Sequence, residues 1–259
     1  MRMLLGLVKP SSGSAEILGC PLTEPSSYLA KVGAMIEGPA FYPKLSAHKN
    51  LQYLQRVSGA RVDHGSIEEA LARVGLAGRG QENYRGFSLG MKQRLGIAAA
   101  LMSAPELLIL DEPTNGLDPS GIHEVRELMK RLAAQGTSVF VSSHLLSEIE
   151  MIAEYLVMLR NGKVIFSGKT ESLLEAQQPI IIAKPEYAVD MSKLVAIAQQ
   201  NGHSASIVED ALHVLSPAEW SATFNRLAFE AGVTLANLAT VRPSLEETFF
   251  ELTTESGAN

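Results

Sequence analysis

The segment that most restricts the fold is a run of four apolar residues that ends in two adjacent acids. Leu107 to Leu110 contains no polar side chain, and Asp111 and Glu112 follow directly. A short, continuous apolar run is typical of a strand that is buried on both faces, as in a parallel sheet covered by helices. In open α/β sheets, ligands bind beyond the carboxyl ends of the strands. The run therefore predicts a parallel sheet with two carboxylates at its ligand-binding edge.

Strands and helices alternate around this run. Val32 to Ile36 predicts an earlier strand, and Ser138 to Ser142 predicts a later one. Between them, Pro119 occupies a position that suits the first turn of a helix, apolar residues recur at helical spacing after it, and Gly136 ends the pattern. The alternation favours a doubly wound α/β sheet.

A helical subdomain is expected at about residues 46–103. Ser46 is the predicted cap of its first helix, and Ser66 with Glu69 has the spacing of a capping box. At the start of the sequence, Met1 to Val8 has apolar residues at helical spacing, so we expect the tail of a core helix there.

The pattern restarts near the C-terminus. Asn161-Gly162, between two strand-like runs, predicts a hairpin. The elements expected after it follow the order strand, helix, two strands, helix, strand, which is typical of a ferredoxin-like module. Ser244 begins a last capped helix. We therefore predict two domains, 1–174 and 175–259, the second a small α+β module.

Composition excludes several classes of protein. The chain has 259 residues, of which 46% are hydrophobic and 19% charged, as in an ordinary globular protein. A net charge of -6, with no block of Lys and Arg, argues against a nucleic-acid partner. The single cysteine excludes an intramolecular disulfide. No run approaches the roughly 20 apolar residues that a membrane-spanning helix needs.

Two segments together resemble the ABC ATPase family. Leu107 to Pro119 has the form of the family's Walker B strand and D-loop, and Tyr84 to Leu95 is similar to its signature motif and the following helix. Ser88 and Gly90 match the common form LSGGQ. The departures are Phe87, Leu89 and Met91. We identify the form FSLGM as usual in ATPases of bacterial antibiotic-resistance exporters.

The resemblance implies an α/β fold of the P-loop NTPase type, a RecA-like ABC ATPase lobe with a helical subdomain, and ATP and Mg²⁺ as cofactors. It implies that Asp111 holds Mg²⁺, that Glu112 is the general base, and that Asp118 is the D-loop carboxylate at a dimer interface. Two acids suit this chemistry, because a hard cation needs oxygen ligands and proton abstraction needs a second carboxylate. The alternative is an acidic turn that only caps the next helix.

The signature residues Ser88, Leu89, Gly90 and Met91 are implied to bind nucleotide. A helix that opens at Ser88 directs unpaired N–H groups and a positive dipole end toward an anion. The resemblance makes that anion the γ-phosphate bound by the opposite protomer. The alternative is that Ser88 is only an N-cap.

His144 and Glu37 complete the predicted site. His144 follows a predicted strand where the family has its switch histidine, in contact with the γ-phosphate. Glu37 stands where the family has its Q-loop glutamine, and it is expected to bind nucleotide or Mg²⁺, although an ionised carboxylate cannot donate a hydrogen bond. The loop Gly38 to Tyr42 is expected to contact the permease, or else to be a surface turn.

A P-loop of the form GxxxxGK followed by Ser or Thr does not occur in the 259 residues. We expect it upstream of Met1, through a start assigned too late or a fragment, and we expect catalysis by the residues printed here to be impaired.

The favoured function is an ATP-hydrolysing subunit that works as a homodimer or with a paired ATPase subunit. We expect it to drive export of a drug, peptide antibiotic or lipid through a separate integral-membrane permease. Its expected location is cytoplasmic, on the inner face of the membrane. The alternatives are a non-catalytic regulatory protein, or an ABC-type ATPase that acts on nucleic acid or ribosomes.

Overall fold

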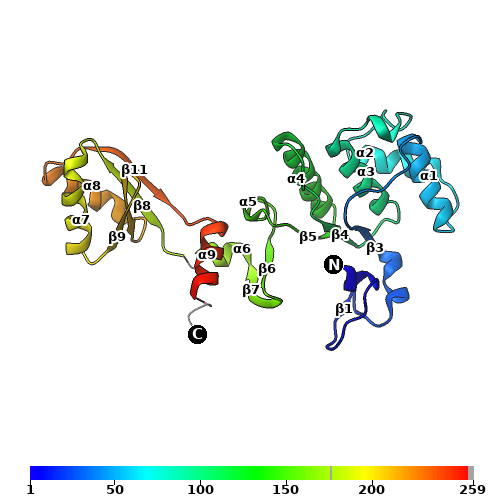
Figure 1. Ribbon diagram of the computed structural model, residues 1–259, viewed down its shortest axis with the longest axis horizontal. Helices are drawn as coiled ribbons and strands as arrows, with labels where there is room; N and C mark the ends of the chain where they lie inside the picture. The colour runs from blue at the N-terminus through cyan, green and yellow to red at the C-terminus, as the bar shows by residue number, and fades with distance from the viewer. Residues whose placement is uncertain (176, 256–259) are drawn as a thin grey trace. The chain divides into compact units, whose positions relative to one another are not determined.

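The computed structural model describes residues 1–175 and 177–255 of the chain. The chain divides into two compact units, Met1–Glu148 and Ile149–Asn259. Figure 1 shows the helices and strands of each. None of the helices in the described part of the chain is both long enough and apolar enough to cross a membrane.

A parallel three-stranded sheet organises the first unit. Its order is β3 (Val32–Met35), β4 (Leu107–Asp111) and β5 (Ser138–Ser142), so the strand predicted at Leu107 to Leu110 lies in a parallel sheet, as expected. The three central side chains of β4 are completely buried, which explains why the run contains no polar residue. The α/β fold class predicted from the sequence is confirmed.

Four helices belong wholly to this unit: α1 (Ala47–Val57), α2 (His64–Arg73), α3 (Leu89–Leu101) and α4 (Pro119–Ala134). The helix α3 packs directly on β3. A Cβ atom on Gly33 would lie 2.2 Å from the carbonyl oxygen of Ala100, so only glycine permits this approach. A short helix, α5 (Leu146–Glu150), follows β5.

In the first unit, the predicted helix starts are correct in three places and wrong in one. Ser46, Ser88 and Asp118 each accept a hydrogen bond from a backbone N–H in the first turn of the helix that follows. The predicted capping box at Ser66 is wrong, because α2 begins earlier and Asp63 caps it by accepting from the N–H of Gly65 at 2.9 Å. Either residue suits an N-cap, so the sequence alone allowed both.

The predicted helix at Met1 to Val8 is also wrong. Only Arg2–Leu5 is helical, as a single 3₁₀ turn, and Gly6 ends it in the left-handed conformation with φ 69°. One turn before such a residue is too short for i→i+4 hydrogen bonding. The segment still packs on a small core that includes Tyr28 and Ile109, and it is followed by β1 (Glu16–Ile17) and β2 (Cys20–Pro21).

The second unit begins with the predicted hairpin. β6 (Tyr155–Arg160) and β7 (Lys163–Lys169) pair antiparallel. Asn161 and Gly162, at its tip, have φ of 50° and 75°. Two successive positive φ angles match the right-handed twist of the strands, which is why Asn-Gly predicted this turn correctly. The helix α6 (Thr170–Glu175) follows.

The predicted ferredoxin-like module is confirmed by its topology. Its elements are β8 (Ile180–Pro185), α7 (Met191–Gln200), β9 (Ser204–Val208), β10 (Ala211–Leu215), α8 (Trp220–Glu230) and β11 (Leu235–Val241). The sheet order is β11-β8-β10-β9, with every pair antiparallel. Phe224 and Leu194 are completely buried in a core that the module forms with its own residues. The predicted domain boundary between residues 174 and 175 stays a prediction.

The last helix, α9 (Leu245–Glu255), has the capping box that the sequence predicted. The N–H of Ser244 donates to Glu247 Oε2 at 2.7 Å, and the N–H of Glu247 donates to Ser244 Oγ at 3.3 Å.

Candidate functional site

The carboxyl ends of β4 and β5 bring two acids and a histidine together. Asp111 is the last residue of β4 and pairs in register with Ser142 of β5. The Ser142 hydroxyl donates to Asp111 Oδ1 at 2.5 Å. Beyond the strands, His144 Nδ1 lies 2.8 Å from Glu112 Oε2, and their side chains are 62% and 33% exposed. A carboxylate of this exposure can reach both solvent water and the imidazole.

Glu112 has an unusual backbone conformation. Its φ of 48° lies in the left-handed region, which costs about 1–2 kcal/mol for a residue with a Cβ atom. Its N–H donates to both the carbonyl oxygen and the hydroxyl of Ser142, each at 3.2 Å. Strain of this kind persists where neighbouring contacts enforce it, and it is concentrated at functional sites.

Glu37 follows β3, the third strand of the same sheet. Its φ is 61°, so it too has a left-handed backbone. The structure pairs its carboxylate with the guanidinium of Arg2, and both side chains are more than half exposed. Sequence reasoning missed this pair, because two residues 35 positions apart give no periodic signal.

The residues fit a magnesium ion that a nucleotide helps to hold. Among residues 1–175 and 177–255, no three His, Cys, Asp or Glu side chains gather as a complete metal site. Mg²⁺ does not need one, since it usually keeps several waters and takes one or two carboxylates together with substrate phosphates. The carboxylate of Asp111, which accepts a hydrogen bond from the Ser142 hydroxyl, is an oxygen donor of this kind.

The predicted signature residues lie in a second cluster. Ser88, Leu89, Gly90 and Met91 line a hollow of about 630 Å³ together with Asp118. A Cβ atom on Gly90 would lie 3.9 Å from the Cα of Gly121, so the first turns of α3 and α4 are adjacent. Two helix N-termini therefore border one hollow, and each contributes partial positive charge.

The N-caps of α3 and α4 leave some backbone N–H groups at this hollow without a partner in the helix. Ser88 Oγ accepts from the N–H of Met91 at 3.2 Å, and Asp118 Oδ1 accepts from the N–H of Gly121 at 3.2 Å. The first four N–H groups of a helix lack partners within the helix, and each cap engages only one of them. The amides of Leu89 and Gly90 are thus placed to bind an anion.

Two arginines in this hollow were not anticipated. Arg79 and Arg94 both line it. Arg94 forms an ion pair with Glu124 at 3.2 Å and donates to the carbonyl oxygens of Val74 and Gly75. Its position one helical turn after Gly90 is a signal that could have identified it.

The chain thus carries two clusters. The hollow lined by Ser88 to Met91 and Asp118, called the α3/α4 hollow below, does not include Asp111, Glu112 or His144 in its lining. The first cluster can hold a cation and accept a proton, and the second can bind an anion.

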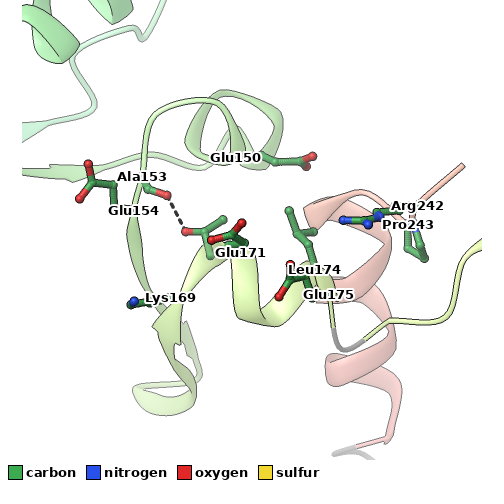
Figure 2. A pocket seen from close by; sticks show the side chains of 10 residues that line it. Glu150, Ala153, Glu154, Lys169, Glu171, Leu174, Glu175, Arg242 and Pro243 are labelled. Atoms are coloured by element: carbon green, nitrogen blue, oxygen red, sulfur yellow. Dashed lines mark hydrogen bonds between the residues drawn. The ribbon is translucent and has the colours of Figure 1, made fainter.

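Another hollow, of about 570 Å³, lies in the second unit (Figure 2). Four glutamates line it together with two cationic residues, Lys169 and Arg242. Figure 2 shows Glu171 and Glu175 on α6, where the Thr170 hydroxyl donates to the carbonyl oxygen of Ala153 at 2.6 Å. An excess of carboxylates disfavours phosphate groups, so we do not place a nucleotide there.

Comparison with known proteins identifies clear relatives. A family model described as "ABC transporter" matches residues 1–115. The bacitracin transport ATP-binding protein BcrA of Bacillus licheniformis is 37% identical over 258 residues, covering 97% of this chain and 83% of that protein. The lantibiotic transport ATP-binding protein SrtF of Streptococcus pyogenes is 43% identical over 165 residues, or 64% of this chain and 70% of that protein. A solved ATP-binding subunit of an ABC transporter is 29% identical, with a TM-score of 0.56 over 68% of this chain and 74% of its own.

Proposed function

This chain belongs to the family of ABC transporter ATP-binding proteins, and from that premise we propose that it energises export of a peptide antibiotic through a separate permease. The observation that carries the catalytic part is the contact of 2.8 Å between Glu112 and His144, beside Asp111 at the carboxyl edge of the sheet. The choice of cargo is supported by the relatives, since BcrA and SrtF are named for transport of bacitracin and a lantibiotic.

In the proposed reaction, Glu112 is the general base. Its carboxylate accepts a proton from the water that attacks the γ-phosphate of ATP, a role that contributes roughly 10²–10⁴-fold to the rate. His144 fixes the orientation of that carboxylate through Nδ1. Asp111 would hold Mg²⁺, and the ion would neutralise charge on the phosphates. Glu37, at the end of the neighbouring strand, is a further oxygen ligand in this proposal.

The two clusters support a paired arrangement. We propose that the α3/α4 hollow of one copy binds phosphates that the carboxylate cluster of another copy acts on, so that Ser88 to Met91 and Asp118 contribute across a dimer interface. A homodimer or a paired ATPase subunit satisfies this geometry equally. The permease would hold the pair at the inner face of the membrane, and the net charge of -6 supports the exclusion of nucleic acid as a partner.

The experiment is co-expression of the chain with its permease in a bacterium that is sensitive to bacitracin. Because the 259 residues contain no GxxxxGK[ST] run, the expressed protein carries a P-loop segment in frame ahead of Met1. Glu112→Gln is expected to lower ATP hydrolysis by the purified complex by about 10²–10⁴-fold and to abolish resistance, while ATP binding persists. The matched control is Glu69→Gln, because Glu69 is exposed on α2 and lies outside both clusters.

Unchanged hydrolysis in Glu112→Gln would remove Glu112 from the mechanism. A wild-type complex that binds ATP without hydrolysing it would favour the regulatory alternative. If the complex hydrolyses ATP but gives resistance to no peptide antibiotic, the proposed ATPase activity stands and the proposed cargo is refuted.

A further inference from the structure

The Ser142 side chain contacts both Asp111, the last residue of β4, and Glu112, which follows it. Its hydroxyl donates to Asp111 Oδ1 at 2.5 Å and accepts from the N–H of Glu112 at 3.2 Å. A hydroxyl is the smallest side-chain group that can donate and accept at once. The parallel register, which sets Asp111 opposite Ser142, places the hydroxyl at the junction of the two residues.

The contact with Glu112 acts on its backbone. Glu112 has a φ of 48°, and its N–H is shared between the carbonyl oxygen and the hydroxyl of Ser142. This backbone conformation directs the carboxylate toward His144, whose Nδ1 is 2.8 Å away. The orientation of the carboxylate therefore depends on what holds the Glu112 amide.

We propose that Ser142 is a positioning residue for ATP hydrolysis, which orients the Asp111 carboxylate and fixes the backbone of Glu112 through one hydroxyl group. The proposal rests on the proposed function, because it assigns to Ser142 a role in that reaction. Ser142 acts through the two acids and not on the nucleotide.

The neighbouring residue offers a matched control. Ser143 has the same side chain, is similarly half-buried, and follows directly in the chain. Its hydroxyl accepts from the N–H of Leu145 at 3.0 Å, so its hydrogen bond is made toward α5 and not toward β4. Removing either hydroxyl costs one or two local hydrogen bonds, but only Ser142→Ala alters contacts with the acids.

The first measurement is hydrogen exchange of the Glu112 amide in the ¹⁵N-labelled chain without nucleotide. Ser142→Ala is expected to accelerate it about two- to tenfold, the worth of one hydrogen bond, whereas Ser142→Thr and Ser143→Ala leave it unchanged. If Ser142→Ala is insoluble, Ser142→Cys is used, since a thiol is only a weak donor and acceptor and the same acceleration is expected. If the Glu112 amide exchanges at the wild-type rate in the folded Ser142 variant, the proposal is overturned.

The second measurement is hydrolysis by the permease complex that carries the added P-loop segment. Ser142→Ala is expected to lower kcat and to raise the half-saturating Mg²⁺ concentration, each by roughly 10–100-fold, with the KM for ATP unchanged at saturating Mg²⁺. Ser142→Thr is expected to restore both values. A loss in Ser143→Ala as large as in Ser142→Ala would show a merely structural role. If the wild-type complex has no hydrolysis, the proposed function fails, and the exchange measurement still decides whether Ser142 fixes Glu112.

Discussion

Replacing Glu112 by glycine is expected to give a more stable protein than replacing it by alanine. Both changes remove the contact with His144, so the difference between them isolates the backbone at φ 48°. In this backbone conformation a residue with a Cβ atom destabilises the folded state by about 1–2 kcal/mol relative to glycine. The greater conformational freedom of glycine in the unfolded chain reduces that advantage by about 0.4–1 kcal/mol. The net expectation is that Glu112→Gly is more stable than Glu112→Ala by about 0.8 kcal/mol.

The same pair of substitutions at Glu69 is the control, because Glu69 lies within the helix α2. There glycine is expected to be less stable than alanine by about 0.8–1 kcal/mol, so the sign of the difference reverses between the two sites. Urea unfolding of the four variants measures it. A fluorophore on Cys20, the single cysteine, reports the first unit, and Trp220, the single tryptophan, reports the second.

The result that would refute this reasoning is a glycine variant at position 112 that is less stable than the alanine variant, as at position 69. The Glu112 backbone would then not be strained in the folded protein, and the role given to Ser142 in holding it would lose its basis. The Trp220 transition is expected to be the same in all four variants.

Two further predictions concern groups outside the carboxylate cluster. Asp118→Ala removes the cap of α4 and is expected to lower the free energy of unfolding of the first unit by about 1 kcal/mol, whereas Asp118→Asn keeps the cap. The urea midpoint reported by the fluorophore on Cys20 measures both variants, and equal losses in the two would contradict this prediction. Lys184 donates to Asp210 and lowers the pKa of that carboxyl below its ordinary value of 3.8. The pair therefore stabilises the fold above pH 3.8 and not below the lowered pKa. Asp210→Asn should thus lower the Trp220-reported urea midpoint at neutral pH, and the deficit should shrink as the pH falls below 3.8. A deficit of equal size at neutral pH and below pH 3.8 would show that the carboxylate charge is not involved.

Much of the fold could be predicted because its signals are local. The apolar run of β4 and the Asn161-Gly162 turn depend on residues a few positions apart, and both were correct. The ferredoxin-like order of the C-terminal module followed from the alternation of such signals. The errors were local too. Ser66 and Asp63 both suit an N-cap, and the helical spacing of Met1 to Val8 continued past Gly6, where the backbone turns left-handed.

The candidate site could be predicted where a motif is continuous in sequence, or where a residue such as His144 or Glu37 follows a predicted strand. Asp111, Glu112 and Ser88 stand in such runs. Ser142 does not, because its contact with Asp111 joins residues 31 positions apart through the pairing of β4 and β5. A serine at the end of a strand is unremarkable until the register of that strand is known. The ion pair between Glu37 and Arg2 could not be predicted for the same reason.

Capping and ligand binding at Ser88 and Asp118 are two alternatives that the sequence left open. Both residues are N-caps, which would favour the structural interpretation if capping used all the free amides of a helix start. Each cap engages one amide, which leaves those of Leu89 and Gly90 in α3 and that of Ser120 in α4, where Pro119 has no N–H. The remaining amides of α3 and α4 border a common hollow, because Gly90 lets the two first turns approach. The caps hold these turns in place and leave other amides without a partner in the helix, so capping is compatible with the proposed binding of an anion at this hollow.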